Sequence, residues 1–284
     1  MGVLAGKAVV ITGSGRGIGA TVARLAAQEG ASVVVNDIDG ETANETTQAI
    51  VAAGGRAVAH VADVSQWDQA GELIERALVE FGRLDGLVNN AALFIMARPH
   101  EQDPEEFRRL IEVNVIGTAF CGIHALKHFV AQDSGSLVNI SSGASWGSPA
   151  QGAYGASKGA VSSLTYSWAR DVEGTGVRIN AVAPNAMTRM AEIFEAFYGD
   201  SAPGQNVGKD PMLNAPAVVF LLSDRSVGIN GQVVRIDGEE MTLMTHPAVQ
   251  EPALYSPNWT PESVAEAFDE TLTARQLPLG ISRV

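Results

Sequence analysis

Tyr154 and Lys158 lie four residues apart in the chain. On a helix, this spacing places both side chains on one face. A phenol has a pKa of about 10 and is mostly protonated at neutral pH. A neighbouring ammonium group favours the phenolate, which brings the phenol into range as a general acid or base. The pair is therefore suited to exchanging a proton with a bound substrate.

Ser142 ends a strand-like segment, Leu137–Ser142, and precedes Tyr154 by 12 positions. A hydroxyl and a phenol can therefore converge above the same edge of a sheet. Ser141 is the alternative hydroxyl at this place. Alternation along the strand favours Ser142, because it lies at the strand tip.

A glycine-rich segment, Thr12–Gly19, lies between a strand-like run and a segment with helical periodicity. Glycines at such a junction allow a tight turn and let backbone amides approach a pyrophosphate at the positive end of the helix. The position of the segment after the first strand favours nucleotide binding over a plain tight turn. The residues that we expect at the cofactor are Gly13, Ser14, Arg16, Gly17, Ile18 and Gly19.

Asp37 ends the second strand-like run, 18 residues after Gly19. A carboxylate there accepts hydrogen bonds from both hydroxyls of the adenosine ribose and repels a 2′-phosphate. Arg16 has the opposite effect, because a guanidinium near the ribose can hold a phosphate. We give Asp37 more weight, since a carboxylate at the strand tip lies closest to the 2′ oxygen, and predict NAD as the cofactor. NADP is the alternative.

The elements that must position these residues alternate along the chain, with short β-branched runs separated by segments of helical periodicity. This alternation predicts a single Rossmann-type α/β domain, a doubly wound parallel sheet of seven strands with helices on both faces. We place this domain at residues 1–240, with a substrate lid at about 187–210 and a C-terminal extension at 241–284. The strands are expected at residues 8–11, 32–37, 57–63, 84–89, 137–141, 178–182 and 231–236.

Polar residues also follow the third and fourth strands, at the sheet edge where doubly wound folds bind ligands. Asp63 and Val64 follow the third strand, and Asn89–Ala92 follows the fourth. The Asp63 side chain can meet an adenine amino group. For Asn89 and Asn90, a cofactor contact and a structural bond between neighbouring strands remain as alternatives.

Seven motifs share one order along the chain: Thr12–Gly19, Asp63-Val64, Asn89–Ala92, Asn114-Val115, Ser141-Ser142, Tyr154–Lys158 and Pro184-Asn185. Together they resemble the short-chain dehydrogenase/reductase (SDR) family over about residues 5–240. The resemblance implies that Tyr154 exchanges a proton with the substrate oxygen and that Ser142 hydrogen-bonds the same oxygen. It also implies that Lys158 lowers the pKa of the tyrosine and binds the nicotinamide ribose, and that Asn114 holds a water in the proton relay. Hydride then moves between the nicotinamide and the substrate carbon.

The resemblance extends the expected cofactor site beyond the glycine-rich segment. Thr188 is expected at the nicotinamide carboxamide, with a helix N-cap as its alternative role. The further cofactor contacts that we predict are Ile38, Asp63, Val64, Asn90, Ala91, Tyr154, Lys158, Pro184 and Thr188.

The chain departs from the family pattern at three points. Ala92 and Asn185 stand where the family usually has glycine, and the interval from Ser142 to the tyrosine is one residue shorter than usual. Asparagine tolerates a left-handed backbone better than other non-glycine residues, so Asn185 is a mild change. Pro184-Asn185, followed by Arg189-Met190, also resembles dehydrogenases that act on 3-hydroxyacyl-CoA thioesters.

The residues that flank the expected pocket are mostly apolar, which predicts a bulky secondary alcohol or ketone as substrate. We therefore predict an NAD(H)-dependent oxidoreductase that interconverts a secondary alcohol and a ketone. The alternatives are an NADPH-dependent carbonyl reductase, a 3-hydroxyacyl-CoA dehydrogenase, and a non-catalytic nucleotide-binding scaffold on the same fold. The flanking residues are Phe94, Ile95, Met96, Ala144, Trp146, Ser148, Tyr154, Met187, Met190, Ile193, Phe194 and Phe197.

The composition argues against several other classes. With 19 basic and 32 acidic residues among 284, the net charge of −13 disfavours nucleic acid or an anionic membrane as the main partner. The single cysteine, Cys121, excludes an internal disulfide framework, and no histidine pair has metal-ligand partners, so we expect no metal site. The sequence shows neither an apolar run of membrane-spanning length nor an export signal, which predicts a cytoplasmic protein.

The C-terminal extension goes beyond the usual end of the family near Asp237-Gly238. It is acidic, and a helix is expected from Thr260, the N-cap, to about Arg275. Its many apolar residues predict that it packs on its own lid or reaches a neighbouring subunit. The helices that follow Pro104 and Gly152 look like the faces through which this family usually forms homotetramers.

Overall fold

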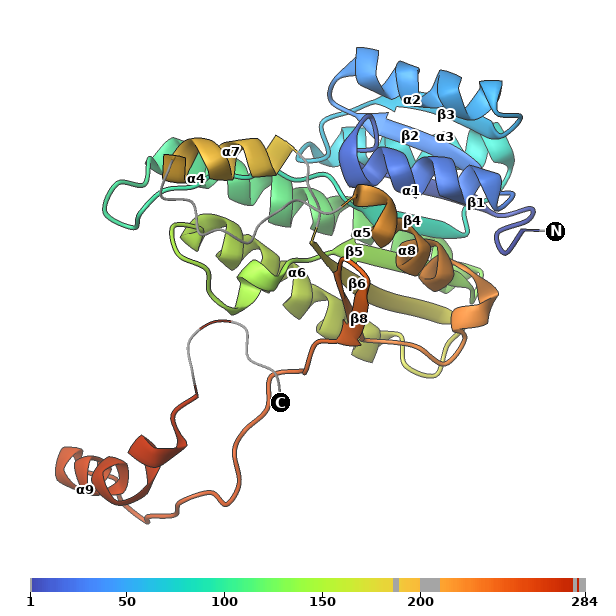
Figure 1. Ribbon diagram of the computed structural model, residues 1–284. Helices are drawn as coiled ribbons and strands as arrows, with labels where there is room; N and C mark the ends of the chain where they lie inside the picture. The colour runs from blue at the N-terminus through green and yellow to red at the C-terminus, as the bar shows by residue number, and fades with distance from the viewer. Residues whose placement is uncertain (1, 186–188, 200–209, 278–279, 281–284) are drawn as a thin grey trace. The chain divides into compact units, whose positions relative to one another are not determined.

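The computed structural model describes residues 2–185, 189–199, 210–277 and 280 (Figure 1). Eight strands form a single sheet in the order β3-β2-β1-β4-β5-β6-β7-β8, and all neighbouring pairs are parallel except β7 and β8. The predicted doubly wound α/β fold is therefore confirmed. The strands are β1 (Ala8–Ile11), β2 (Ser32–Asp37), β3 (Arg56–Val61), β4 (Gly86–Asn89), β5 (Gly135–Ile140), β6 (Val177–Asn185), β7 (Val233–Asp237) and β8 (Glu240–Leu243).

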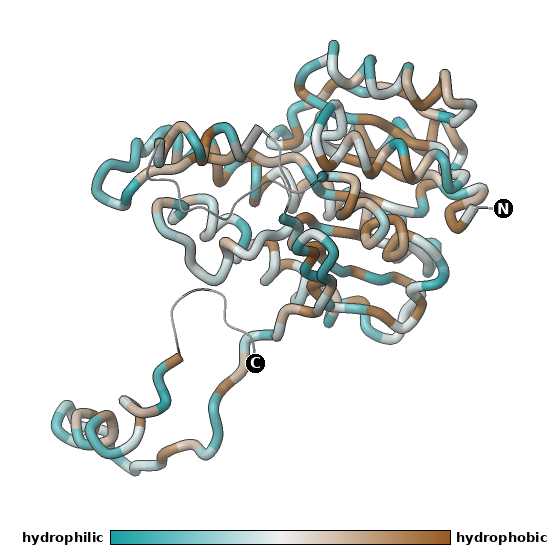
Figure 2. The backbone as a smooth tube through the Cα atoms, viewed as in Figure 1, coloured by the Kyte–Doolittle hydropathy of each residue, from teal (hydrophilic) through white to brown (hydrophobic). Residues whose placement is uncertain are grey.

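Helices cover both faces of the sheet (Figure 1). One face is covered by α1 (Gly17–Gln28), α2 (Gly40–Ala52) and α8 (Ala215–Leu222), whose apolar side chains form one buried cluster with the strands. The other face is covered by α3 (Trp67–Phe81), α5 (Thr118–Ala131) and α6 (Gly152–Asp171), which contribute to a second cluster. Because strands of a parallel sheet are buried on both faces, they are continuous apolar runs, which appear as brown segments of the tube in Figure 2.

The prediction of where the sheet ends was wrong. It placed the last strand before Asp237-Gly238, whereas β8 pairs antiparallel with β7 after a tight turn at Gly238, whose φ is +65°. A glycine tolerates this left-handed backbone without strain. All four residues of β8 are exposed. Met241 and Leu243 alternate with Glu240 and Thr242, but a run of four residues is the shortest in which such alternation indicates a strand.

Helix α4 (Pro104–Ile111) continues through a π-helical segment, η1 (Glu112–Gly117), into α5. Within the part of the chain that the structure describes, the combined helix Pro104–Ala131 is the one segment long and apolar enough to cross a membrane by length and composition. Its apolar residues Leu110, Cys121 and Phe129 are fully buried in the protein. Burial in the core therefore accounts for their hydrophobic character.

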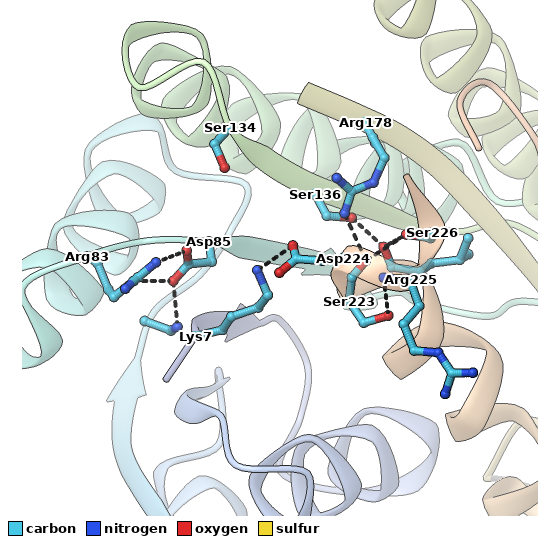
Figure 3. A network of polar contacts seen from close by, with 12 residues as sticks. Lys7, Arg83, Asp85, Ser134, Ser136, Arg178, Ser223, Asp224, Arg225 and Ser226 are labelled. Carbon is cyan, nitrogen blue, oxygen red and sulfur yellow. Dashed lines mark hydrogen bonds and ion pairs between the residues drawn. The ribbon is translucent and has the colours of Figure 1, made fainter. Parts of the chain in front are cut away.

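A polar network joins the amino ends of the strands to the end of α8 (Figure 3). Lys7 Nζ lies 2.8 Å from Asp224 Oδ1, and the Asp85 carboxylate accepts from Arg83 and from the backbone N–H of Ala8, the latter at 2.8 Å. Arg178 donates to the carbonyl of Ser223 at 3.1 Å. These groups are used to fix strand and helix ends, and the cavity described below lies at the opposite, carboxyl edge of the sheet.

The chain divides into two compact units, Met1–Met244 and Thr245–Val284. The second unit contains α9 (Pro261–Ala267), followed by short helical segments to Arg275, as the sequence analysis predicted. Thr260 caps this helix, and its side chain and that of Ser263 form a reciprocal capping box. None of the residues of α9 is buried.

Candidate active site

A cavity of about 700 Å³ lies at the carboxyl ends of the strands. This is where doubly wound sheets bind ligands, beside the point where the strand order reverses between β1 and β4. The predicted site residues that line it are Gly13, Arg16, Gly17, Ile18, Asp37, Ile38, Asp63, Val64, Asn90, Ala91, Ser142, Tyr154, Lys158 and Pro184. Ser14, Gly19 and Asn114 are described by the structure and do not line the cavity, whereas Thr188 lies outside the described residues.

Tyr154 and Ser142 come together inside this cavity, from helix α6 and from the segment after β5. Burial raises the pKa of the Tyr154 phenol to about 12, while the interaction with the Ser142 side chain acts in the opposite direction. The ring of Phe94 packs edge-on against the tyrosine ring, with 4.8 Å between the ring centres. The phenol is therefore held in an apolar wall, protonated at neutral pH and next to a second hydroxyl.

Lys158 is almost completely buried one turn after Tyr154, and its Nζ donates to the carbonyl of Ile140 at 2.7 Å. Burial lowers the pKa of Lys158 to about 8. The ammonium group lies 5.7 Å from the centre of the Tyr154 ring. Burial is the largest influence on the Tyr154 phenol, whose pKa therefore lies above its ordinary value.

The two serines after β5 have different surroundings. The hydroxyl of Ser141 is 2.7 Å from that of Ser162 and donates to the carbonyl of Lys158 at 3.2 Å. Both partners lie on helix α6, so Ser141 fixes the end of β5 to this helix. The hydroxyl of Ser142 accepts from the backbone N–H of Ala144 at 3.2 Å and keeps its own proton to donate. This arrangement favours Ser142 as the hydroxyl that meets a substrate.

Asn114 is completely buried in the π-helical segment η1. Its side-chain oxygen accepts from the backbone N–H of Leu93 at 2.7 Å, and its amide donates to the Leu93 carbonyl at 2.9 Å and to Ser157 Oγ at 3.0 Å. Both amide hydrogens are therefore used to join the loop after β4 to helix α6. The side chain of Asn114 thus holds these two segments together, a function that spacing alone did not predict.

The glycine-rich loop has the geometry that close approach of a pyrophosphate requires. Gly13 and Gly17 have φ values of +58° and +57°, in the left-handed region. A Cβ at Gly13 would lie 2.7 Å from Ala91 Cα, and one at Gly19 would lie 2.5 Å from Asn90 Nδ2. Gly19, although it does not line the cavity, is thus needed to let helix α1 approach the end of β4.

Asp37 lies at the tip of β2 and is 7% exposed. Its Oδ2 accepts from the backbone N–H of Gly15 at 3.1 Å, and its Oδ1 accepts from that of Asp39 at 3.2 Å. Each carboxylate oxygen has a further lone pair, so the group can still accept from a ribose. Asp37 therefore shapes the glycine-rich loop and also presents negative charge to the cavity.

Asn90 fixes the end of β4 to the glycine-rich loop. Its amide donates to the carbonyls of Thr12 and Gly13 at 2.9 and 2.8 Å, and its backbone N–H donates to Thr12 Oγ1 at 2.9 Å. Asn89 likewise joins Asn139 on β5, at 3.0 Å. Of the two alternatives for the asparagines, the structure shows the bond between neighbouring strands for both, and Asn90 also lines the cavity.

Arg109 lines the cavity as well, although the sequence analysis did not select it. It donates to Asp63 Oδ2 at 2.8 Å and to Ser65 Oγ at 3.0 Å. The sequence gives no signal for this pair, because 46 residues separate the partners and Arg109 lies among the ordinary charged residues of α4.

The substrate end of the cavity is lined by Phe94, Gln151, Ile193 and Phe194. Ile193 and Phe194 belong to α7 (Arg189–Tyr198), which forms within the predicted lid. Residues 187–188 and 200–209 of that lid lie outside the described residues. Trp146, which was expected at the pocket, instead packs against a cluster that contains Met244.

The other reactive groups within the described part of the chain do not form a second centre. Cys121 is fully buried, and burial raises the pKa of its thiol to about 12, so it acts as a small apolar residue. Among the residues that the structure describes, no group of three or more His, Cys, Asp or Glu side chains could hold a metal ion.

The comparisons with known proteins agree with this geometry. A sequence model described as short chain dehydrogenase matches residues 7–196. The chain is 40% identical to the cis-4-hydroxycyclohexanecarboxylate dehydrogenase of Sinomonas cyclohexanicum over 239 residues, covering 82% of this chain and 95% of that protein. It is 37% identical to 3beta-hydroxysteroid dehydrogenase 1 of Eggerthella lenta over 253 residues, covering 84% and 95%.

A solved structure matches the whole chain. The crystal structure of a short chain dehydrogenase from Mycobacterium avium is similar with a TM-score of 0.86 and 32% identity, covering 100% of both chains. The sequence, the fold and the relatives thus point to an oxidoreductase that uses a nicotinamide dinucleotide and acts on an alcohol or a ketone. The chain belongs to the short-chain dehydrogenase/reductase family.

Proposed function

We propose that the protein is an NAD(H)-dependent dehydrogenase that interconverts a cyclic secondary alcohol and the corresponding ketone. The observation that carries this proposal is the convergence of Ser142, Tyr154 and Lys158 in the same cavity as the glycine-rich loop and Asp37. The apolar wall of Phe94, Ile193 and Phe194 suits a ring-shaped hydrocarbon skeleton. The name of the relative from Sinomonas cyclohexanicum, which denotes a ring alcohol, supports this substrate class.

The residues fit a dinucleotide that lies across the carboxyl edge of the sheet. The glycine-rich loop and the amino end of α1 would hold its pyrophosphate, because the glycines expose their backbone N–H groups and the helix end is positive. Asp37 would hold the adenosine ribose and Lys158 the nicotinamide ribose. When bound, the dinucleotide supplies the hydride chemistry.

The chain itself supplies proton transfer and orientation. In ketone reduction, the Tyr154 phenol donates its proton to the substrate oxygen, and the Ser142 hydroxyl hydrogen-bonds the same oxygen. In alcohol oxidation, Tyr154 accepts the hydroxyl proton, and the nearby positive charge of Lys158 stabilises the resulting phenolate. Asn114 keeps the loop at Leu93 and the helix that carries Tyr154 at a fixed distance.

NAD is proposed over NADP because Asp37 presents its carboxylate at the tip of β2, where a 2′-phosphate would be repelled. A 3-hydroxyacyl-CoA substrate is less favoured, because the cations that line the cavity are already engaged or distant from its substrate end. Lys158 donates to the Ile140 carbonyl, and Arg109 pairs with Asp63.

We also propose a cytoplasmic homotetramer, in line with the family. Exposed apolar side chains on the helix Pro104–Ala131, at Phe107, Ile116, Ile123 and Val130, support an assembly face there.

A spectrophotometric screen for NADH formation tests the proposed reaction. The panel contains substituted cyclohexanols, hydroxysteroids, terpenols, linear secondary alcohols and 3-hydroxyacyl-CoA esters. We expect turnover with ring alcohols and NAD, and slower turnover with NADP. Turnover confined to CoA esters, or to NADP, would overturn the assignment of substrate or cofactor.

A further inference from the structure

Arg109 connects two parts of the chain that are remote in sequence. It lies in the last turn of α4, and its guanidinium reaches the segment after β3, where Asp63 and Ser65 accept its hydrogen bonds at 2.8 and 3.0 Å. The nitrogen that donates to Ser65, Nη1, also lies 3.6 Å from Glu112 Oε2. The planar guanidinium is thus fixed by three partners and forms part of the cavity wall.

The strand order places this contact at the adenosine half of the cavity. Asp37 and Asp63 follow β2 and β3, which lie on one side of the point where the strand order reverses. Ser142 follows β5, and Tyr154 lies on the helix after it, on the other side of that point. The group that Arg109 binds, Asp63, therefore lies on the adenosine side of that point.

The bonds around Asp63 keep its carboxylate ionised and fixed in orientation. Burial alone would raise the pKa of Asp63, but hydrogen bonds from Ser65 and Arg109 outweigh it and lower the pKa. Ser65 donates from its hydroxyl at 2.6 Å and from its backbone N–H at 2.9 Å, both to Oδ1. Arg109 is bound to Oδ2, so one residue orients each oxygen. An ionised carboxylate is a pure acceptor, which suits an exocyclic amino group.

We propose that Arg109 is a positioning residue for the adenosine half of the dinucleotide: it orients the Asp63 carboxylate as an acceptor for the adenine amino group and closes the cavity wall beside it. The proposal rests on the proposed use of a nicotinamide dinucleotide. Arg109 therefore affects binding of the adenosine half and takes no part in the chemistry at the nicotinamide.

Binding measurements on Arg109→Ala and Arg109→Lys test this assignment. NADH and ADP-ribose are titrated into each variant, by NADH fluorescence and by calorimetry. Loss of a charge-assisted hydrogen bond predicts a rise in Kd of about tenfold for both ligands in Arg109→Ala, with partial rescue in Arg109→Lys. A tenfold rise in Kd corresponds to a loss of about 1.4 kcal/mol of binding free energy. Because this loss is confined to the adenosine half, the kcat at saturating NAD and the KM for the alcohol are expected to stay within about twofold of wild type.

Arg108→Ala is the matched control, since Arg108 lies next to Arg109 on α4 and pairs with exposed Glu105. Its Kd values are expected to match those of wild type. Equal Kd values for Arg109→Ala and Arg108→Ala, or a fall in kcat without a change in Kd, would overturn the proposal. If the wild-type protein bound neither NADH nor NADPH, the proposed function would fail instead, which is a distinguishable result.

A double-mutant cycle with Asp63→Asn excludes a purely structural effect. If Arg109 acts through Asp63, each single variant raises Kd and the double variant binds no more weakly than the weaker single variant. Additive losses would contradict the proposal. Thermal unfolding of every variant shows whether the fold is retained. If Arg109→Ala unfolds, the cycle is built from Arg109→Lys and Asp63→Asn, which preserves the shape of the side chain.

Discussion

Lys158 Nζ lies 5.7 Å from the centre of the Tyr154 ring and donates to the carbonyl of Ile140 at 2.7 Å. Both side chains are buried, and burial moves their pKa values toward the neutral forms, to about 12 for Tyr154 and about 8 for Lys158. The fold thus buries the ammonium group of Lys158 in surroundings where its positive charge costs free energy. A group held at such a cost is expected to serve function rather than stability.

Replacing Lys158 with methionine is therefore expected to stabilise the protein while abolishing efficient turnover. The depression of the pKa of Lys158 from 10.5 to about 8 corresponds to a burial cost of about 3 kcal/mol, partly offset by the bond to Ile140. We expect the free energy of unfolding of Lys158→Met at pH 7 to exceed that of wild type by about 2 kcal/mol, measured by urea denaturation.

The size of this effect depends on pH, whereas its sign stays the same. Because the folded pKa lies below the unfolded one, the cost is present in full below pH 8 and disappears as the pH rises from about 8 to about 10.5. The advantage of the variant should therefore shrink over that range. Lys127→Met, at an exposed lysine, should change stability by less than about 1 kcal/mol at either pH. A variant less stable than wild type at pH 7 would contradict the argument.

Asp37→Ser is expected to relax the choice between NAD and NADP. The substitution removes the negative charge that repels a 2′-phosphate, so the ratio of kcat/KM for NAD to that for NADP should fall by at least about tenfold. Asp39→Ala is the control, because Asp39 caps α2 two residues further on and accepts from Glu41 and Thr42. It should lower stability by about 1 kcal/mol without changing the ratio. An unchanged ratio in Asp37→Ser would show that another residue selects the cofactor.

The sequence predicted the elements whose function requires particular residue types. The glycine-rich loop was predictable because a left-handed φ at Gly13 and Gly17 and close approach at Gly19 leave few alternatives to glycine. The side of α6 that faces the cavity was predictable because Tyr154 and Lys158 are one helical turn apart.

Contacts between remote segments could not be predicted in this way. The bonds of Asn114 to Leu93 and Ser157 depend on a π-helical turn, which has no sequence pattern of its own. The Arg109–Asp63 pair joins two charged residues of ordinary surface type. Strand β8 was missed because its alternation of polar and apolar residues spans only four positions.

Asn114→Ala is expected to destabilise the fold around the cavity. The substitution removes three hydrogen bonds and leaves the backbone groups of Leu93 and the buried Ser157 hydroxyl without this partner, which should lower the free energy of unfolding by about 2 to 4 kcal/mol. Asn44→Ala, which removes one exposed bond to the carbonyl of Gly40 on α2, should cost less than about 1 kcal/mol. Urea denaturation measures the free energy of unfolding of both variants. Equal values would show that the bonds of Asn114 do not hold the Leu93 loop and helix α6 together.

Turnover of Tyr154→Phe, measured at saturating substrate and NAD together with the Kd for NADH, tests the central claim most directly. The variant keeps the ring that packs against Phe94 but loses the group that exchanges the proton. We predict a fall in kcat of about 100- to 10,000-fold, with the Kd for NADH within about twofold of wild type, whereas Tyr166→Phe on the same helix stays near wild type. Full turnover by Tyr154→Phe would contradict the assignment of Tyr154 as the acid and base.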